Sequence, residues 1–507
     1  MPVTADNSNA PDFDVLIVGA GISGIGMAAH MRMKAPGHSF AIIERRENLG
    51  GTWDLFRYPG IRSDSDMHTL GFDFEPWRHE KSIADAPSIL EYLNRIVDER
   101  NIRETIQFGQ KVISADFREN EARWYVEMEQ ADGTRSQLTA NFLYLGSGYY
   151  DYDEPYDPGF QLGAFKGQVL HPQFWPEDLN YTGKKVVVIG SGATAVTIVP
   201  SMADKAEKVT MLQRTPTWMA MRPAKDAIAN AIRKVLPEKL AYKITRFKNI
   251  RMQDFTFKIA RNKPEKVKES LHKAIEKSLG ADYDKAAFTP PYDPWDQRLC
   301  LVPDGDMFEA MKAGKAEIVT GHIEAFEANG IRLKSGELLE ADIIITATGL
   351  KMALAGKIDV SVNGEAVDFA KRFYYKGCMF SNLPNLAVVF GYLNASWTLR
   401  ADVNSDYICR VLNHMRSTGT AIATPVMTPA LEGQLEEDDI FDFSSGYIQR
   451  AKAIQPKSST DFPWRLNQEY ISDRKQMAKD PVDDGLLTFT RTGANAQSAD
   501  EQLEAAE

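Results

Sequence analysis

The sequence predicts an α/β protein, because it holds two similar strand–glycine–helix units. In the first, the apolar run Phe13–Val18 meets the turn Gly19-Ala20-Gly21-Ile22-Ser23-Gly24, and an Ala/Met-rich helix leads to a second strand, Phe40–Ile43. In the second, Val186–Ile189 meets the turn Gly190-Ser191-Gly192-Ala193-Thr194-Ala195, and Val209–Leu212 follows. Each order is typical of a βαβ unit whose turn holds a dinucleotide. The pair predicts two Rossmann-like dinucleotide-binding domains.

Length and composition limit the other possibilities. The 507 residues suit two or three domains, and 43% hydrophobic with 25% charged residues is typical of a globular protein. The net charge of −11 disfavours a general nucleic-acid partner. Three cysteines without CxxC spacing predict neither a disulfide framework nor a redox-active pair, and the scattered histidines predict no metal site. No stretch has the pattern of a signal peptide or an integral membrane segment, so we expect a cytoplasmic protein.

The order of the strands predicts how the two domains are connected. Phe142–Leu145 leads into Gly146-Ser147-Gly148, and Ala341–Thr346 leads into Ala347-Thr348-Gly349. We expect the chain to cross between the domains at these two points, with the second domain inserted into the first. The predicted boundaries are 1–148 and 347–492 for the first domain, 149–223 and 290–346 for the second, 224–289 for a helical insertion, and 493–507 for a disordered acidic tail.

The insertion has a composition of its own. Ile228, Ile232 and Val235 recur at helical spacing, as do Leu240, Ile244 and Phe247, and Lys and Arg are dense. We interpret the basic surface as a solvated helical face. Contact with an anionic membrane is the alternative.

The residues around the two turns predict different ligands. Gly19, Gly21 and Gly24 allow the tight turn, the approach of a pyrophosphate and helix packing, and Glu44 ends the next strand, where a carboxylate accepts hydrogen bonds from a free ribose. In the second unit Ala195 replaces the third glycine, and Arg214 and Thr215 stand where the acid would be. A guanidinium matches a 2′-phosphate that a carboxylate would repel. One site of each kind predicts FAD together with NADPH.

Two longer patterns resemble a known family. Phe165, Gly167, His171, Trp175 and Pro176 match FxGxxxHxxxW(P/D), the signature of Baeyer–Villiger monooxygenases. A second family pattern comprises Gly50-Gly51-Thr52-Trp53, Tyr58-Pro59-Gly60 and Asp64. The similarity covers nearly the whole chain and is closest to the ethionamide-activating subgroup, through the stretches 50–67, 190–196, 294–303 and 394–399.

The resemblance implies a role for each matching residue. It implies that Arg298, held by Asp64, lies over the flavin and stabilises a C4a-peroxyflavin. It implies FAD contacts for Ser23, Glu44, Thr52, Trp53, Asp54, Leu55, Asp64 and Val112. It implies that the NADPH site is lined by Arg62, Ser63, Asp64, Gly190, Ser191, Gly192, Ala193, Thr194, Ala195, Val196, Arg214 and Thr215.

Three positions leave alternatives open. His171 lies in an oxygenase signature and is a candidate general base, but its place on an interdomain linker favours a structural and conformational role. Trp464 resembles a tryptophan that the family carries late in the sequence, on a mobile loop over NADP. The alternative is a packed core residue. Gln297 stands where many members of the family have a lysine that helps hold the 2′-phosphate, which weakens the prediction of strict NADPH selectivity.

Together these features predict a monooxygenase that uses O2 and NADPH to convert ketones to esters or lactones and that also oxidises sulfides and thioamides. One alternative is a heteroatom monooxygenase with little ketone activity. The others are an NADPH-oxidising flavoprotein that produces H2O2 and a non-enzymatic binding module. Oligomeric state and physiological substrate are not readable from these patterns.

Overall fold

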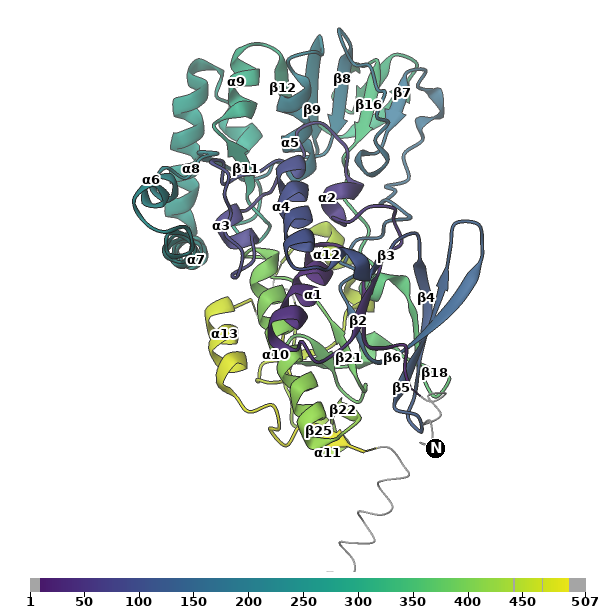
Figure 1. Cartoon of the computed structure of the whole chain (residues 1–507). Helices are drawn as coiled ribbons and strands as arrows, with labels where there is room; N and C mark the ends of the chain where they lie inside the picture. Colours follow the sequence, from purple (N-terminus) through teal and green to yellow (C-terminus); the bar gives the residue numbers. More distant parts are fainter. Residues whose placement is uncertain (1–9, 441–442, 467, 492–507) are drawn as a thin grey trace, which may run out of the picture.

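The computed structural model describes residues 10–440, 443–466 and 468–491. Two sheets lie one above the other along the molecule, each with helices packed beside it (Figure 1). The lower sheet is nine-stranded, in the order β18-β17-β4-β5-β6-β1-β2-β3, with β21 also paired to β6. The upper sheet has five strands in the order β12-β9-β8-β16-β7, all parallel.

The lower sheet is parallel around β1, where β1 pairs with β2 and β6 and β2 pairs with β3, whereas β4, β5 and β6 form an antiparallel meander. Its central strands read as continuous apolar runs because helices and loops cover both of their faces. Its strands are β1 (Phe13–Val18), β2 (Phe40–Ile43), β3 (Ile106–Gln107), β4 (Lys111–Arg118), β5 (Arg123–Glu129), β6 (Arg135–Leu145), β17 (Asp359–Val362), β18 (Glu365–Ala366) and β21 (Leu386–Val388).

The upper sheet lies between two segments of the lower one in the sequence. Its strands are β7 (Gln168–Leu170), β8 (Lys185–Ile189), β9 (Lys208–Gln213), β12 (Ala316–Thr320) and β16 (Ile343–Thr346). They follow β6 and precede β17, so the second dinucleotide-type sheet is inserted into the first, as predicted. The expected strand Phe142–Leu145 is the end of β6, and the last four residues of the expected strand Ala341–Thr346 form β16.

Short strand pairs complete the structure. β10 (Met219–Arg222) pairs in parallel with β11 (Cys300–Pro303), which joins the two ends of the helical insertion to each other. The remaining strands are β13 (Ile323–Glu327), β14 (Gly330–Leu333), β15 (Leu338–Glu340), β19 (Tyr374–Tyr375), β20 (Met379–Phe380), β22 (Ile422–Pro425), β23 (Glu437–Asp438), β24 (Ser458–Ser459) and β25 (Leu487–Thr490).

Helix α1 (Ile22–Lys34) is buried along most of its length, with α10 (Trp397–Thr418) packed against it and Gly26 leaving room for the Phe72 ring. The other helices are α2 (Thr52–Leu55), α3 (Met67–Leu70), α4 (Ala86–Glu99), α5 (Ala193–Met202), α6 (Ala227–Val235), α7 (Glu238–Asn262), α8 (Pro264–Leu279), α9 (Asp306–Lys312), α11 (Pro429–Glu432), α12 (Gly446–Arg450) and α13 (Tyr470–Lys479).

The predicted helical insertion is formed by α6, α7 and α8, which lie together at one edge of the molecule (Figure 1). Within the described residues, no helix combines the length and the apolar character needed to cross a bilayer. The tail predicted to be disordered, 493–507, lies outside the described residues.

Candidate functional site

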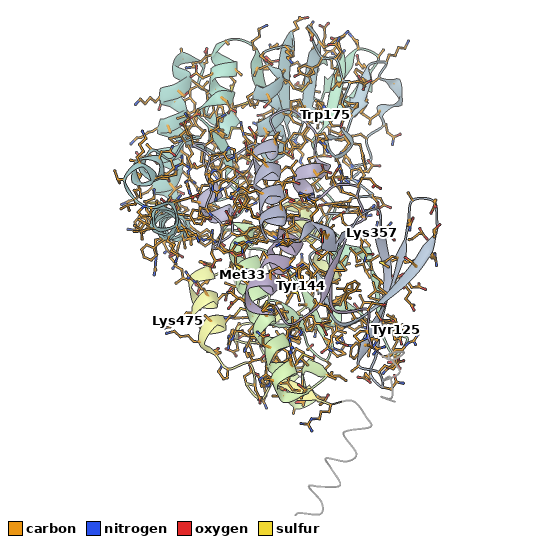
Figure 2. All side chains as sticks on the ribbon, in the orientation of Figure 1. Met33, Tyr125, Tyr144, Trp175, Lys357 and Lys475 are labelled. Carbon is orange, nitrogen blue, oxygen red and sulfur yellow. The ribbon has the colours of Figure 1, made fainter. Side chains whose placement is uncertain are left out.

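A cavity of about 320 Å³ lies between the two glycine turns. Its wall includes residues of both βαβ units, of the loop that follows β2, and of the segment that follows β6. Lys357, which Figure 2 labels between the two sheets, is also in the wall. The two predicted dinucleotide sites therefore open into one space.

The first glycine turn is closely backed by the chain that leaves β6. Gly19 has φ +98°, which favours glycine, and a Cβ there would lie 2.9 Å from the Gly146 carbonyl oxygen. A Cβ on Gly24 would lie only 1.9 Å from the Gly19 carbonyl oxygen. Helix α1 starts at Gly21 with no side-chain cap, so its first amides remain available to an anion. This geometry fits the pyrophosphate of FAD.

Glu44 occupies the end of β2 as predicted. It is buried, and its carboxylate accepts hydrogen bonds from the backbone N–H groups of Ala20 (2.7 Å) and Arg46 (2.9 Å). Burial raises the pKa of Glu44, and the two backbone hydrogen bonds act against that rise. The side chain also lines the cavity, so it is held beside the turn, where the ribose of a bound dinucleotide would lie.

The loop after β2 connects the two units. A Cβ on Gly51 would lie 3.0 Å from the Cα of Gly21, so this loop lies directly over the first turn. Further along, the Tyr58 side chain lies near Thr194 in the first turn of α5, and burial raises the pKa of Tyr58 to about 12. The loop residues thus contact both turns at once.

The second glycine turn has more open surroundings. Gly190 (φ +135°) is backed by Ala347, whose carbonyl oxygen would lie 2.2 Å from an added Cβ, but a Cβ on Gly192 would meet nothing within 4 Å. Ser191 Oγ donates to the Thr215 carbonyl (2.8 Å) and so fixes the end of β9 beside the turn. Arg214 is exposed there, and no ion pair or hydrogen bond of its side chain occurs within the described part of the chain.

Polar atoms without partners also fit a bound group. Ser147 and Gln110 line the cavity, and Ser147 Oγ and Gln110 Oε1 are buried without a hydrogen-bond partner among the described residues. Arg62 forms an ion pair with Asp306, yet its Nη2 is buried and unpaired within the same residues. Buried polar atoms are normally satisfied, so these atoms suit the polar groups of a ligand.

Arg298 and Asp64 meet at the cavity wall although 234 positions separate them. Arg298 Nη1 donates to Asp64 Oδ2 at 2.8 Å, and the two side chains are 39% and 35% accessible, through the cavity they line. Burial alone would lower the pKa of the Arg298 guanidinium, but the Asp64 carboxylate and nearby tyrosines outweigh it and raise that pKa. The cavity therefore holds a permanent cation in a fixed position.

Sequence reasoning missed an aromatic wall beside this pair. The Tyr149 ring stacks on Trp397 (5.1 Å between centroids, 11° between planes), and its hydroxyl lies 2.5 Å from that of Tyr150. Trp397 Nε1 donates to Ser23 Oγ (2.7 Å). Burial raises the pKa of both tyrosines, so both stay neutral. The available signal was their position directly after Gly146-Ser147-Gly148.

His171 and Trp464, the two site candidates with alternative roles, both lie away from the cavity wall. His171 Nδ1 accepts from the backbone N–H of Gln173 (3.1 Å), and burial lowers its pKa despite an opposing effect of the Gly349 backbone. Trp464 is buried and packs edge-on against Tyr375 in the lower core. Trp464 thus lies in the packed core, and His171 lies on the segment between the two sheets, with its ring bonded to the local backbone.

The cavity gathers about half of the predicted site residues. Those in its wall are Gly19, Gly21, Ser23, Glu44, Thr52, Trp53, Arg62, Ser63, Asp64, Val112, Ala193, Thr194 and Arg298. Outside it, Asp54 is bound by Arg46 (2.7 Å) and Arg57 (2.6 Å). The others not in the wall are Gly24, Leu55, His171, Gly190, Ser191, Gly192, Ala195, Val196, Arg214, Thr215 and Trp464.

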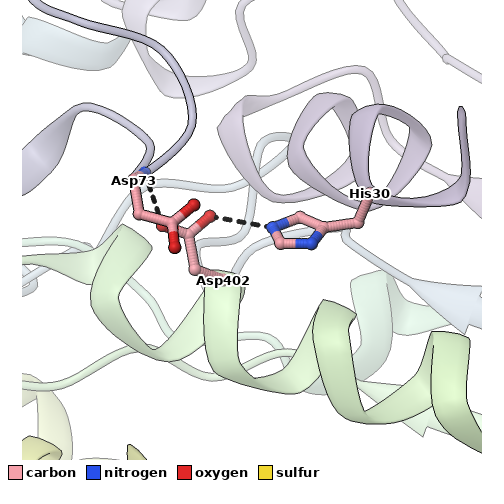
Figure 3. A group of neighbouring side chains, drawn as sticks. All are labelled: His30, Asp73 and Asp402. Atoms are coloured by element: carbon pink, nitrogen blue, oxygen red, sulfur yellow. Dashed lines mark hydrogen bonds and ion pairs between the residues drawn. The ribbon is translucent and has the colours of Figure 1, made fainter. Parts of the chain in front are cut away.

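Cys378, Cys409 and a histidine–aspartate cluster lie apart from this site, whereas the Cys300 thiol lies 3.8 Å from the Ser191 carbonyl oxygen of the second turn. Cys300, Cys378 and Cys409 are buried and free, and burial raises the pKa of each thiol. His30, Asp73 and Asp402 come within ligating distance of one another (Figure 3). However, Asp402 is bonded to His30 Nε2 (3.2 Å), Arg246 (3.2 Å) and the Asp73 N–H (3.0 Å). Its oxygens thus already tie together α1, α7 and α10.

Comparisons with known proteins agree with this architecture. Residues 16–277 match the family described as pyridine nucleotide-disulphide oxidoreductase. The chain is 49% identical over 483 residues to the FAD-containing monooxygenase EthA of Mycolicibacterium smegmatis, covering 94% of this chain and 97% of that protein. Its fold is similar to oxidized steroid monooxygenase bound to NADP (TM-score 0.74, 21% identity, 94% and 99% coverage) and to ε-caprolactone-bound cyclohexanone monooxygenase (TM-score 0.74, 20% identity, 94% and 99% coverage). The chain therefore belongs to the family of FAD-containing monooxygenases.

Proposed function

We propose that this protein is an NADPH-consuming Baeyer–Villiger monooxygenase that converts ketones to esters or lactones and also oxidises sulfides and thioamides. The observation that carries the proposal is the Arg298–Asp64 pair in a cavity shared by both glycine turns. When bound, FAD supplies hydride acceptance from a reduced nicotinamide and activation of O2. The complete FxGxxxHxxxW(P/D) pattern and the solved cyclohexanone monooxygenase of the same fold support the ketone chemistry.

Arg298 places positive charge where a reacting oxygen becomes negative. The guanidinium stays protonated at any working pH, and Asp64 fixes its position through the 2.8 Å hydrogen bond. A fixed cation in an enclosed site stabilises developing negative charge without first having to reorganise. We infer that this is how the site favours attack on a ketone carbonyl.

The aromatic wall keeps water away from the same place. Tyr149, Trp397 and Phe390 pack against one another, and the Tyr149 and Tyr150 hydroxyls satisfy each other. Excluding water strengthens electrostatic interactions and limits side reactions such as release of H2O2. Since one hydroxyl of this pair donates to the other, the accepting tyrosine can still donate one hydrogen bond to a substrate oxygen.

The remaining residues divide between the two dinucleotides. Glu44 and the first turn would hold FAD, and the second turn with Arg62, Arg214 and Thr215 would hold NADPH. His171 is assigned a linker role rather than proton transfer, and Trp464 a core role. A cytoplasmic location belongs to the same proposal, since free thiols suit a reducing compartment.

Replacing Arg298 with Ala tests the proposal. We expect the variant to bind FAD and to oxidise NADPH, while ester formation falls by about a hundred- to a thousandfold and H2O2 replaces the product. Product mass and peroxide are measured with a cyclic ketone and, separately, an aryl sulfide. Arg332→Ala is the matched control, because Arg332 pairs with Glu327 at 2.7 Å in a different part of the protein.

Ester formation at the parental rate in Arg298→Ala would contradict the assigned role. A parent protein that oxidises the sulfide but never the ketone would instead identify a heteroatom monooxygenase. Peroxide alone with every substrate would identify an NADPH oxidase.

A further inference from the structure

The large exposed apolar side chains of this protein are concentrated in one place. Within the described residues, eleven large hydrophobic side chains are exposed, and seven of them lie between residues 228 and 255. They are Ile228 and Val235 of α6 and Leu240, Ile244, Phe247, Met252 and Phe255 of α7. We call these seven residues the α6–α7 apolar face. Single exposed apolar residues are ordinary, but a cluster of this size indicates an interaction surface.

Helix α7 is turned with its polar side inward. Its outward stripe, Leu240, Ile244, Phe247 and Phe255, follows the spacing of one helix face, which would face the core in an ordinary amphipathic helix. Its buried residues include Thr245, Arg246 and Asn249. The apolar spacing of the sequence thus marks the side that faces away from the protein.

Specific polar contacts fix this orientation. Arg246 donates to the Gly71 carbonyl (2.6 Å) and pairs with Asp402 (3.2 Å). Asn249 Nδ2 donates to Asp66 Oδ1 (2.9 Å), and the Tyr242 hydroxyl donates to the Phe72 carbonyl (2.7 Å). Rotating the helix to bury Phe247 would break all of these bonds and leave a buried charge unpaired, so the apolar face stays outward.

Cations surround the same face. Residues 227–263 contain ten Lys or Arg and two Asp or Glu, a formal charge of +8 in a chain whose net charge is −11. Lys234, Lys239 and Lys243 are exposed and have no ion-pair partner among the residues described. Arg251 lies over the Phe247 ring, 5.5 Å from its centroid. The surface is therefore both apolar and strongly basic.

We propose that the α6–α7 apolar face docks the protein on a membrane surface rich in anionic phospholipids. Apolar side chains would enter the boundary between headgroups and acyl chains while the lysines meet lipid phosphates. A second copy of the chain fits less well, since a symmetric contact would bring the exposed, unpaired lysines Lys234, Lys239 and Lys243 of two copies together. Helix α7 packs on α3, and Leu70 of α3 lines the cavity. Docking would therefore place α7 between the lipid surface and this wall of the cavity.

Vesicle sedimentation of the FAD-loaded, full-length protein tests this proposal. We expect binding to vesicles of equal parts phosphatidylglycerol and phosphatidylcholine, weaker binding to pure phosphatidylcholine, and release by salt. Phe247→Ser and the double variant Lys239→Glu/Lys243→Glu should each reduce binding by about tenfold or more. Phe255→Ser repeats the apolar test at a second position.

Matched controls separate the face from general effects. Phe174→Ser removes an exposed aromatic outside the insertion (51% exposed, against 63% for Phe247), next in sequence to the Trp175 that Figure 2 labels, and Lys205→Glu/Lys334→Glu reverses two exposed lysines elsewhere. These controls should bind as the parent does. Three results would overturn the proposal. They are no binding of the parent to anionic vesicles, binding of both Phe variants at the parental level, and, in place of vesicle binding, a dimer that Phe247→Ser dissociates. Because sedimentation needs no turnover, these outcomes are independent of the oxygenase activity.

Discussion

The two glycine turns share a sequence pattern but have different surroundings. Both are backed by a segment that crosses between the sheets, Gly19 by Gly146 and Gly190 by Ala347. Both begin a helix that no side chain caps. The first turn, however, is covered by Gly51, whereas nothing lies within 4 Å of a Cβ placed on Gly192.

This difference suits one retained and one exchanging ligand. A covered site releases its ligand only when the cover opens, whereas an open site exchanges at every turnover. FAD must remain for many cycles and NADPH is consumed in each. We therefore interpret the closed turn as the permanent FAD site and the open turn as the site through which NADPH enters and leaves.

The largest expected effect comes from adding one methyl group to the closed turn. In Gly24→Ala the new Cβ would lie 1.9 Å from the Gly19 carbonyl oxygen. Overpacking of this kind costs about 1–3 kcal/mol or more, because backbone must move. We expect protein with little or no FAD, measured as the ratio of visible flavin absorbance to protein absorbance after gel filtration.

The open turn provides the matched control. In the second turn, Ala195 stands at the position that corresponds to Gly24, and its side chain is fully buried in the core. Ala195→Gly should cost only about 0.5–1 kcal/mol of stability and keep FAD. Parental flavin content in Gly24→Ala would mean that the first turn is less tightly packed than described, and the contrast between the two turns would fail.

Sequence patterns predicted these turns well because their information is local. Each glycine turn lies in the same βαβ unit as the residue that ends its next strand, Glu44 after β2 in the first unit and Arg214 after β9 in the second. Asp64 and Arg298, 234 positions apart, were paired only through resemblance to a family. Which side of α7 faces inward depends on Arg246 reaching Gly71 and Asp402, and helical spacing carries no such information.

The cofactor preference of the open turn gives the next effect in size. Arg214→Ala removes one charge-assisted phosphate contact, worth about 1.5–3 kcal/mol. We expect the KM for NADPH to rise roughly ten- to a hundredfold while the KM for NADH hardly changes. Steady-state kinetics with both cofactors measures this, with Arg135→Ala, an exposed arginine paired to Glu129, as control. An equal rise in KM for NADPH and for NADH would identify Arg214 as a structural residue.

The smallest effect concerns the contact that joins the two turns. Tyr58→Phe removes the buried hydroxyl that lies near Thr194, and we expect the loss of one hydrogen bond between them to lower the free energy of unfolding by about 0.5–1.5 kcal/mol. Since burial raises the pKa of Tyr58 from 10.0 to about 12, the stability gained by burying the neutral hydroxyl is fully present below pH 10 and is lost as pH rises through 12. The difference in the free energy of unfolding between parent and variant should therefore be constant from about pH 6 to about pH 9, where Tyr58 stays neutral. Denaturant unfolding of the parent, Tyr58→Phe, Thr194→Val and the double variant measures the coupling between the two residues. A coupling energy near zero would show that the loop rests against α5 without this bond, and that the closed and open turns hold their places independently.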